Sequence, residues 1–150
     1  MRIDIIKRRA KMFLDLASEL MNKGILDIAA FHVHQACQLR VKASILRLTG
    51  NTPRVHGVRE LLGILAHALE ELGFRRESDM VMDFTRRFRD VLIDIEASYT
   101  EARYSAYTPS RSVVESMYRV VKELFELLDR VENIVLARYH IRCLRMWRDC

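Results

Sequence analysis

The sequence predicts an all-α protein, an up-and-down bundle of about five helices with a long C-terminal helix, formed as a single domain over residues 1–150. The chain contains only 5 Gly and 2 Pro, which favours long helices joined by few loops. Apolar residues recur at three- and four-residue spacing through most of the chain, and no alternating strand pattern occurs. Half of the residues are hydrophobic and 30% are charged, as is ordinary for a globular domain with a substantial core.

The first two helices are expected to form a hairpin. Residues Ile3 to Met21 carry one apolar stripe, with charged side chains on the opposite side. Gly24 then follows, and glycine suits the left-handed conformation that commonly ends a helix. A second helix from about Ile25 to Thr49 begins so soon afterwards that the pair should be antiparallel.

Two more helices are predicted after a loop at residues 50–57. Val58 to Leu72 carries an apolar stripe and is followed by Gly73, a second helix terminator. Residues 75–78 are expected to bridge to a fourth helix, which runs from about Asp79 to Tyr104.

The last helix is predicted to be the longest. A break at residues 105–110 contains the second proline. Ser112 and Glu115 then have the spacing of a capping box, in which the hydroxyl and the carboxylate satisfy free backbone amides at a helix start. An apolar stripe runs from there to Val135, so the core is expected to comprise about residues 3–137.

Beyond Val135 the same stripe becomes cationic, because its next positions are Arg138, Arg142 and Arg145. Either the helix extends past the bundle, or it breaks and the C-terminal residues pack differently. Residues 138–150 are therefore treated as a basic C-terminal extension.

The charge of the chain favours anionic partners. A net charge of +5 and an isoelectric point near 9.4 suit nucleic acid, nucleotide phosphates or acidic protein surfaces, although a mildly basic soluble surface would give the same values. One function that follows is nucleic-acid binding by the basic tail, whose arginines are Arg138, Arg142, Arg145 and Arg148. Such binding should weaken steeply with salt, because phosphate contacts release counterions.

Cysteine usage and the N-terminal residues predict a cytoplasmic protein. The three cysteines form no CxxC pair and no metal-ligand spacing, which is typical of reduced intracellular proteins. The first residues lack the apolar run of a signal peptide, and no segment approaches the roughly 18 apolar residues that a membrane span needs. We therefore expect no membrane association.

Polar residues are organised on two flanks of the otherwise apolar stretch 29–48. An advance of about 100° per residue places four of them on one flank: His34, Gln35, Gln38 and Lys42. The same geometry places three on another flank: Arg40, Ser44 and Arg47. A largely apolar helix is usually central, so a polar flank on it is expected to line a cleft or meet a second subunit.

Motifs for catalysis or metal binding are absent from the sequence. It contains no Gly-rich phosphate loop, no GxSxG, no HExxH and no acidic metal-binding triplet. No Glu stands three residues before any of the five histidines, as a di-iron bundle would require. His32 and His34 are two residues apart and so point to different sides of a helix. We expect no metal and no cofactor.

Tyr99 and Arg103 lie one helical turn apart at the end of the predicted fourth helix. A phenol and a guanidinium on one face would offer a phosphate contact beside a ring on which a base can stack. In the alternative, Tyr99 belongs to the core stripe and the arginine ties down the following loop. Spacing alone favours this structural alternative.

The stretch AAFHVHQACQLRVKASIL, residues 29–46, resembles the signature of the HEPN family (higher eukaryotes and prokaryotes nucleotide-binding domains). That signature has small and aromatic residues, then Gln-Ala, then Lys-Ala one or two turns later. Gln35 and Lys42, each followed by alanine, match it here.

Two further features agree with the resemblance. His56 stands just before the third predicted helix, and Tyr99, Arg103 and Tyr104 match the Tyr-x-x-x-Arg-Tyr ending of the family. Their order and spacing extend the resemblance to about residues 5–135.

The resemblance implies a five-helix bundle that often dimerises and is commonly found with a separate minimal nucleotidyltransferase, in toxin–antitoxin-like systems of archaea and bacteria. Some members bind nucleotides, and others are metal-independent ribonucleases with an Arg-x(4–6)-His motif. No histidine of this chain has that motif, since the nearest pair, Arg59 and His67, has seven residues between. Ser105 also replaces the Pro that usually follows Arg-Tyr. These departures favour binding over cleavage.

The leading hypothesis is a non-catalytic HEPN-type binding protein, a homodimer, that binds a nucleotide or RNA phosphate, partners a nucleotidyltransferase, or does both. The candidate binding residues are Gln35, Lys42, His56, Tyr99, Arg103 and Tyr104. Lysine and arginine would supply charge-assisted phosphate contacts, and tyrosine a stacking surface. The alternative is a metal-independent ribonuclease that uses a non-standard pair, with His56 and Arg103 as the catalytic candidates.

Overall fold

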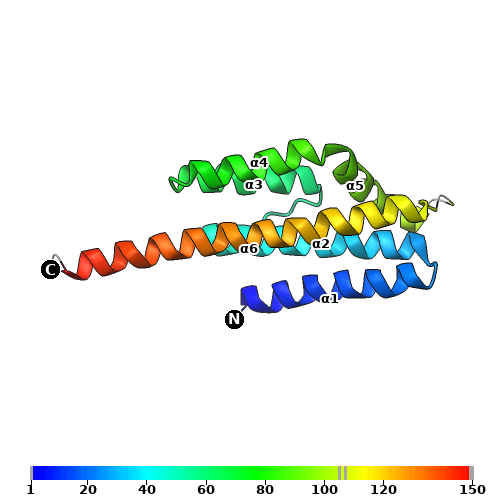
Figure 1. Ribbon diagram of the computed structural model, residues 1–150, viewed down its shortest axis with the longest axis horizontal. Coiled ribbons are helices and arrows are strands. Elements are labelled where there is room, and N and C mark those ends of the chain that lie inside the picture. Colours follow the sequence, from blue (N-terminus) through cyan, green and yellow to red (C-terminus); the bar gives the residue numbers. More distant parts are fainter. Residues whose placement is uncertain (1, 105, 107, 149–150) are drawn as a thin grey trace.

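The computed structural model describes residues 2–104, 106 and 108–148, without the side chains of residues 102, 103 and 147. This part of the chain is all-α with a long C-terminal helix, which confirms the predicted fold class. Its helices are α1 (Arg2–Asn22), α2 (Leu26–Thr49), α3 (Val58–Glu71), α4 (Arg75–Arg87), α5 (Arg89–Tyr104) and α6 (Arg111–Arg148) (Figure 1). Among the described residues, no helix is both long and apolar enough to cross a lipid bilayer.

Helix α2 is the centre of the bundle. It packs against α1, α3, α5 and α6. In Figure 1, α1 lies on one side of the α2–α6 pair, and α3 with α4 lies on the other. Buried side chains on α2 include Ala30, Ala36 and Ala43, and their small size lets several neighbouring helices approach it closely. The prediction that this helix is central is confirmed.

Two predicted glycine terminators are confirmed. Gly24 and Gly73 have φ angles of +76° and +86°, in the left-handed region where a side chain would be strained. After Gly24, the backbone N–H of Ile25 donates to the carbonyl of Leu20 at 2.9 Å, which closes α1 and turns the chain directly into α2.

The predicted single helix from Asp79 to Tyr104 is two helices. The chain breaks at Phe88, whose φ and ψ are −106° and 22°. The ring of Phe88 packs 4.8 Å from that of Phe84, and the N–H of Leu92 still donates to the Phe88 carbonyl at 2.9 Å. Because the apolar stripe keeps its phase across the break, the residue spacing gave no sign of it.

Helix α4 also begins earlier than expected. The predicted bridge at residues 75–78 is its first turn. Glu77 and Ser78 are buried there, and the Ser78 hydroxyl donates to the Ala66 carbonyl of α3 at 2.6 Å. This contact fixes the α3–α4 hairpin and explains how polar residues can occupy a buried helix start.

The cap of α6 is Ser110 rather than the predicted Ser112. The helix begins at Arg111, and the backbone N–H of Val113 donates to the Ser110 hydroxyl at 3.3 Å. Ser112 lies exposed in the first turn. Two serines two residues apart both fit a cap pattern, and the chain uses the first.

Helix α6 continues without a break to Arg148. Of the two predicted outcomes for the C-terminal residues, extension past the bundle is correct, and a change of packing at a break is wrong.

Candidate nucleotide-binding site

Four polar and aromatic side chains from three segments meet beside the middle of α2. His34 and Gln38 come from successive turns of α2, His56 from the loop before α3, and Tyr99 from α5. The ring centroid of Tyr99 lies 4.8 Å from that of His34 and 5.8 Å from that of His56. We call these four residues the His56 cluster. They meet because α2 packs against both α3 and α5.

The exposed ring of His56 is held in one orientation. The Gln38 side-chain nitrogen donates to His56 Nδ1 at 2.7 Å, and the ring plane lies within 9° of the plane of Tyr99. A donor at Nδ1 leaves the proton of the neutral imidazole on Nε2. His56 therefore keeps an N–H donor that Gln38 does not use.

Tyr99 is the aromatic centre of the cluster. Besides the two histidines, it contacts Phe31 of α2, with ring centroids 6.2 Å apart and an interplanar angle of 17°. Aromatic contacts of this kind contribute about 0.5–1.5 kcal/mol each beyond buried area. Tyr99 is half-buried, so it packs against the interior and also reaches the surface beside His56.

Gln35 and Lys42 lie on the same flank of α2 as the cluster. The Gln35 side-chain nitrogen is 3.4 Å from His34 Nδ1. Lys42 is half-buried one turn after Gln38, and burial lowers its pKa. An ammonium that is partly removed from water attracts an anion more strongly than a fully hydrated one.

An ion pair between Arg59 and Glu96 joins the start of α3 to α5, next to the cluster. The Arg59 guanidinium donates two hydrogen bonds to Glu96 Oε2, at 2.8 and 3.0 Å, and its backbone N–H donates to Oε1 at 2.8 Å. Burial opposes ionisation of this carboxyl, but the hydrogen bonds and charge of Arg59 outweigh burial and lower the pKa of Glu96. Glu96 thus caps α3 from another helix and fixes the loop that carries His56.

The two remaining predicted binding residues lie at the end of α5. The side chain of Arg103 lies outside the described residues. Tyr104 is 79% exposed and follows Tyr99 by five residues, so it projects about 140° around the helix from it. Arg59 and His67 are the pair whose spacing comes nearest to the Arg-x(4–6)-His motif, and each binds a different carboxylate. Arg59 binds Glu96, and His67 contacts Glu71 at 3.1 Å.

The other polar flank of α2 is occupied within the chain. Glu132 of α6 is 3% exposed and accepts hydrogen bonds from Arg40 at 3.1 Å, from Ser44 at 2.8 Å, and from Lys7 of α1. Arg40 also donates to Asp129 at 2.8 Å. We call these five residues the Glu132 network.

The Glu132 network joins α1, α2 and α6. Burial opposes ionisation of Glu132, but the charge of Arg40 and the hydrogen bonds of Lys7 and Ser44 outweigh burial and lower its pKa. For this flank, the prediction of a cleft or a second subunit is therefore wrong. Arg40 and Ser44 form hydrogen bonds within the chain, and the Arg47 guanidinium lies 3.6 Å from Asp4 and 3.9 Å from Glu132.

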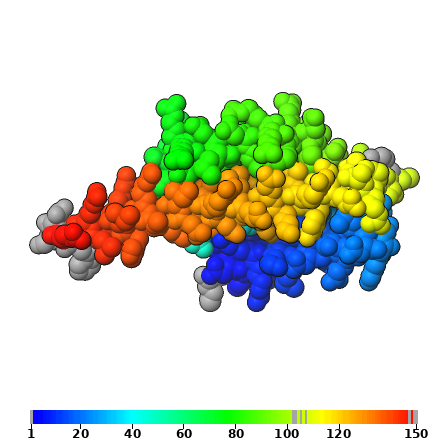
Figure 2. Space-filling model, viewed as in Figure 1, coloured from blue at the N-terminus to red at the C-terminus, as the bar shows by residue number. Residues whose placement is uncertain are grey.

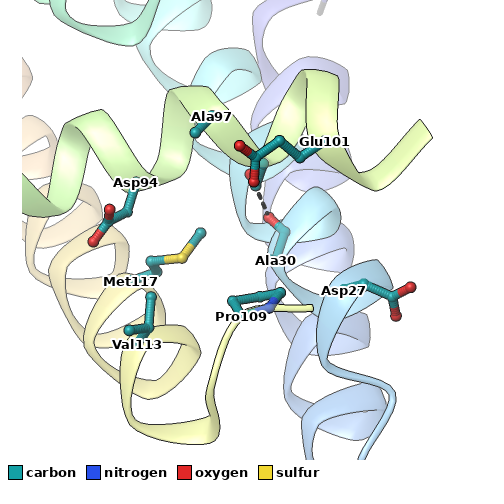
Figure 3. A pocket seen from close by; sticks show the side chains of 9 residues that line it. Asp27, Ala30, Asp94, Ala97, Glu101, Pro109, Val113 and Met117 are labelled. Atoms are coloured by element: carbon teal, nitrogen blue, oxygen red, sulfur yellow. Dashed lines mark hydrogen bonds between the residues drawn. The ribbon is translucent and has the colours of Figure 1, made fainter. Parts of the chain in front are cut away.

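A separate cavity of about 180 Å³ lies between α2, α5 and the start of α6 (Figure 3). Its lining combines apolar side chains such as Met117 with three carboxylates, Asp27, Asp94 and Glu101. None of its lining residues belongs to the His56 cluster. Three carboxylates repel phosphate, so the cavity does not suit a nucleotide.

The arginines of the basic tail lie in the C-terminal part of α6. The Arg138 guanidinium lies 4.8 Å from the ring centroid of Phe74. Arg142, Arg145 and Arg148 are exposed.

Two residues of the cluster were missed as site candidates. Gln38 and His34 are on the predicted polar flank, but nothing in the sequence shows that a side chain distant in sequence meets them. The signal that could have identified them as site residues is their position one helical turn apart, on the same flank as Gln35 and Lys42. Within the described part of the chain, no three His, Cys, Asp or Glu side chains are arranged to hold a metal.

Comparison with protein families identifies the chain. Its sequence matches the HEPN domain over residues 3–131, which is most of the chain. The chain belongs to the HEPN family. A search of curated proteins gave no match. The predicted resemblance is confirmed. The matched residues include the whole His56 cluster and every member of the Glu132 network except Glu132 itself.

In this HEPN domain, the observed geometry separates two regions of α2. One flank carries the His56 cluster, in which His34 and Gln38 are buried and His56 is exposed, and the other carries buried ion pairs that hold the fold. The first is the candidate functional site.

Proposed function

We propose that this HEPN protein is a non-catalytic binding protein, dimeric and cytoplasmic, that holds a nucleotide or RNA phosphate at the His56 cluster. The observation that carries this proposal is the exposed His56 ring, fixed by Gln38 and parallel to Tyr99. A fixed donor reduces the ordering cost of binding, as preorganisation generally does.

The residues around the cluster have the chemistry that a phosphate requires. His56 Nε2–H, held beside Gln38, is one donor, and the Lys42 ammonium, one turn after Gln38 on the same flank of α2, is another. Gln35 adds an amide on that flank. Charge-assisted hydrogen bonds from such groups are stronger than neutral ones. The rings of His56 and Tyr99 offer a surface for a base, with Arg103 and Tyr104 as further candidates at the end of α5.

The same protein is proposed to partner a minimal nucleotidyltransferase in a toxin–antitoxin-like system. Support for this part comes from its membership of the HEPN family. The whole chain, residues 1–150, is proposed to act as one HEPN domain with a basic extension at residues 138–150.

Calorimetric titration with AMP and with a ten-nucleotide single-stranded RNA tests the proposed site. We expect binding that weakens about tenfold in His56→Ala and in Lys42→Gln, because each loses one strong contact. His67→Ala, which alters an exposed histidine elsewhere on α3, is the matched control and should bind normally. Gel filtration reports the oligomeric state. A strict monomer that neither ligand stabilises would contradict the proposal.

A second candidate function is metal-independent ribonuclease activity, favoured by the fixed and exposed imidazole of His56. A histidine in this state can act as general acid or base near neutral pH, with Arg103 as the candidate partner. RNA cleavage that persists with chelator and disappears in His56→Ala would support it. Equal cleavage by that variant would exclude His56 as the catalytic group.

A further inference from the structure

Helix α6 extends well beyond the other helices. Figure 1 shows its C-terminal part running past the N-terminal end of α1, and Figure 2 shows the same part standing clear of the rest of the surface. Every side chain from residue 136 to 146 is exposed. We call residues 136–148 the C-terminal arm.

One side of the arm is held against the α3–α4 hairpin. The ring of Tyr139 lies 5.9 Å from that of Phe74, and the Arg138 guanidinium lies 4.8 Å from the same ring. Phe74 itself is 2% exposed. These contacts fix which side of the arm faces the bundle at its base, and therefore which side faces away.

The side that faces away carries an apolar seam. Its members follow one another at spacings of three, four and three residues, the pattern by which one helix packs along another. They are Ile134, Ala137, Ile141 and Leu144. Ile141 and Leu144 are 52% and 53% exposed, although aliphatic side chains of this size are usually buried. The seam spans about 15 Å of helix at 1.5 Å per residue.

One flank of the seam is cationic. Arg138 and Arg145 each follow a seam residue, Ala137 and Leu144, by one position, and His140 lies on the other side. Between residues 133 and 148 the chain contains four arginines and no Asp or Glu. A helix that packs on this seam would therefore place its own flanking residues next to positive charge.

This charge distribution selects the occupant. A second, antiparallel copy of the arm would bring arginine against arginine, and like charges at flanking positions disfavour that pairing. A second, parallel copy would bring the arginine flank beside the His140 flank and would form no ion pair. RNA would satisfy the arginines but would leave Ile141 and Leu144 against phosphate and sugar. An amphipathic helix with acidic flanks satisfies both the seam and its charges.

We propose that the C-terminal arm is a docking surface for an acidic amphipathic helix of a partner protein. The partner helix packs its apolar face on the seam and places Glu or Asp beside Arg138 and Arg145. This interaction does not depend on the His56 cluster, so it stands or falls separately from the proposed nucleotide binding.

Fluorescence anisotropy with two labelled helical peptides tests the proposal on the full chain. Both peptides carry Leu and Ile at seam-facing positions, and their flanking positions carry Glu in one and Lys in the other. We expect the Glu peptide to bind at least tenfold more tightly than the Lys peptide. The affinity of the Glu peptide should decrease as the salt concentration is raised.

Variants locate the binding surface. Ile141→Asp should weaken the binding of the Glu peptide at least tenfold, because it places a charge in the apolar contact. The control Met12→Asp, on the exposed face of α1, should leave this binding unchanged. Both residues are exposed, so neither change should unfold the protein. The double variant Arg138→Glu with Arg145→Glu should reverse the preference toward the Lys peptide.

Three results would overturn the proposal. They are equal affinity for both peptides, unchanged binding by Ile141→Asp, and an arm that binds only single-stranded RNA or only a second copy of itself. Sedimentation at increasing protein concentration, compared between wild type and Ile141→Asp, identifies the last of these.

Discussion

Glu132→Gln should destabilise the protein strongly, because Glu132, on α6, accepts hydrogen bonds from side chains of both α1 and α2. The amide keeps the size of the side chain and removes its charge. Arg40, which is 3% exposed, then keeps only Asp129 as an anionic partner, and that side chain is 62% exposed. Breaking a buried ion pair typically costs 3–5 kcal/mol. Since Asp129 retains part of the interaction, we expect a loss of about 2–4 kcal/mol, or about 5–15 °C in Tm for a chain of this length.

The pH dependence of this loss has a definite sign. The pKa of Glu132 is lowered by folding, so its contribution is complete above the unfolded value, about 4.3, and disappears as pH falls through the lower folded value. The difference in unfolding free energy between wild type and Glu132→Gln should therefore be largest at pH 7 and should narrow below about pH 4.

Urea denaturation followed by circular dichroism, at pH 7 and at pH 3, measures both effects. Glu123→Gln is the matched control, because its side chain is 48% exposed and lies 3.9 Å from Arg87. It should cost about 0.5 kcal/mol or less. A loss below about 1 kcal/mol for Glu132→Gln at pH 7, or an equal loss at both pH values, would refute the reasoning.

Three further predictions concern local features. Ser110→Ala should lower the free energy of unfolding by about 1 kcal/mol and Ser112→Ala should leave it nearly unchanged, because the hydroxyl of Ser110 caps α6. Urea denaturation of the two variants measures this difference. Burial, with a smaller contribution from the charge of Glu96, raises the pKa of Cys37 to about 12. A disulfide reagent at pH 8 should therefore modify exposed Cys143 rapidly and Cys37 only on unfolding, and mass spectrometry identifies the modified residues. Glu96→Ala should cost about 1–2 kcal/mol, since it removes both the cap of α3 and the ion pair beside it, and thermal melting that matches wild type would contradict this.

The sequence predicts most of the helices well because the apolar stripes have one clear period. Gly24 and Gly73 mark true helix ends for a reason that acts within a few residues, namely the left-handed backbone conformation. Phe88 marks a break that no local preference requires, and its aromatic packing against Phe84 follows from tertiary structure. Local signals therefore locate turns better than they locate breaks inside an apolar stripe.

The candidate site is predictable only in part. Periodicity places His34, Gln38 and Lys42 on one flank of α2, but it does not show that His56 meets Gln38, since that contact requires α3 to dock on α2. The second flank shows the same limit more strongly. Arg40 has its carboxylate partner 92 residues away in the sequence, so nothing near it distinguishes an internal ion pair from a binding surface.

The contacts of the C-terminal arm with Phe74 also give it a pivot. Arg138 and Tyr139 tie α6 to the α3–α4 hairpin where the helix leaves the bundle, and Arg148 lies about 14 Å beyond Tyr139 at 1.5 Å per residue. Over that length, each degree of tilt at the pivot would move the tip by about 0.2 Å. A tilt of about five degrees would therefore shift the tip by about an ångström, enough to change how a side chain of a docked helix fits against the end of the arm.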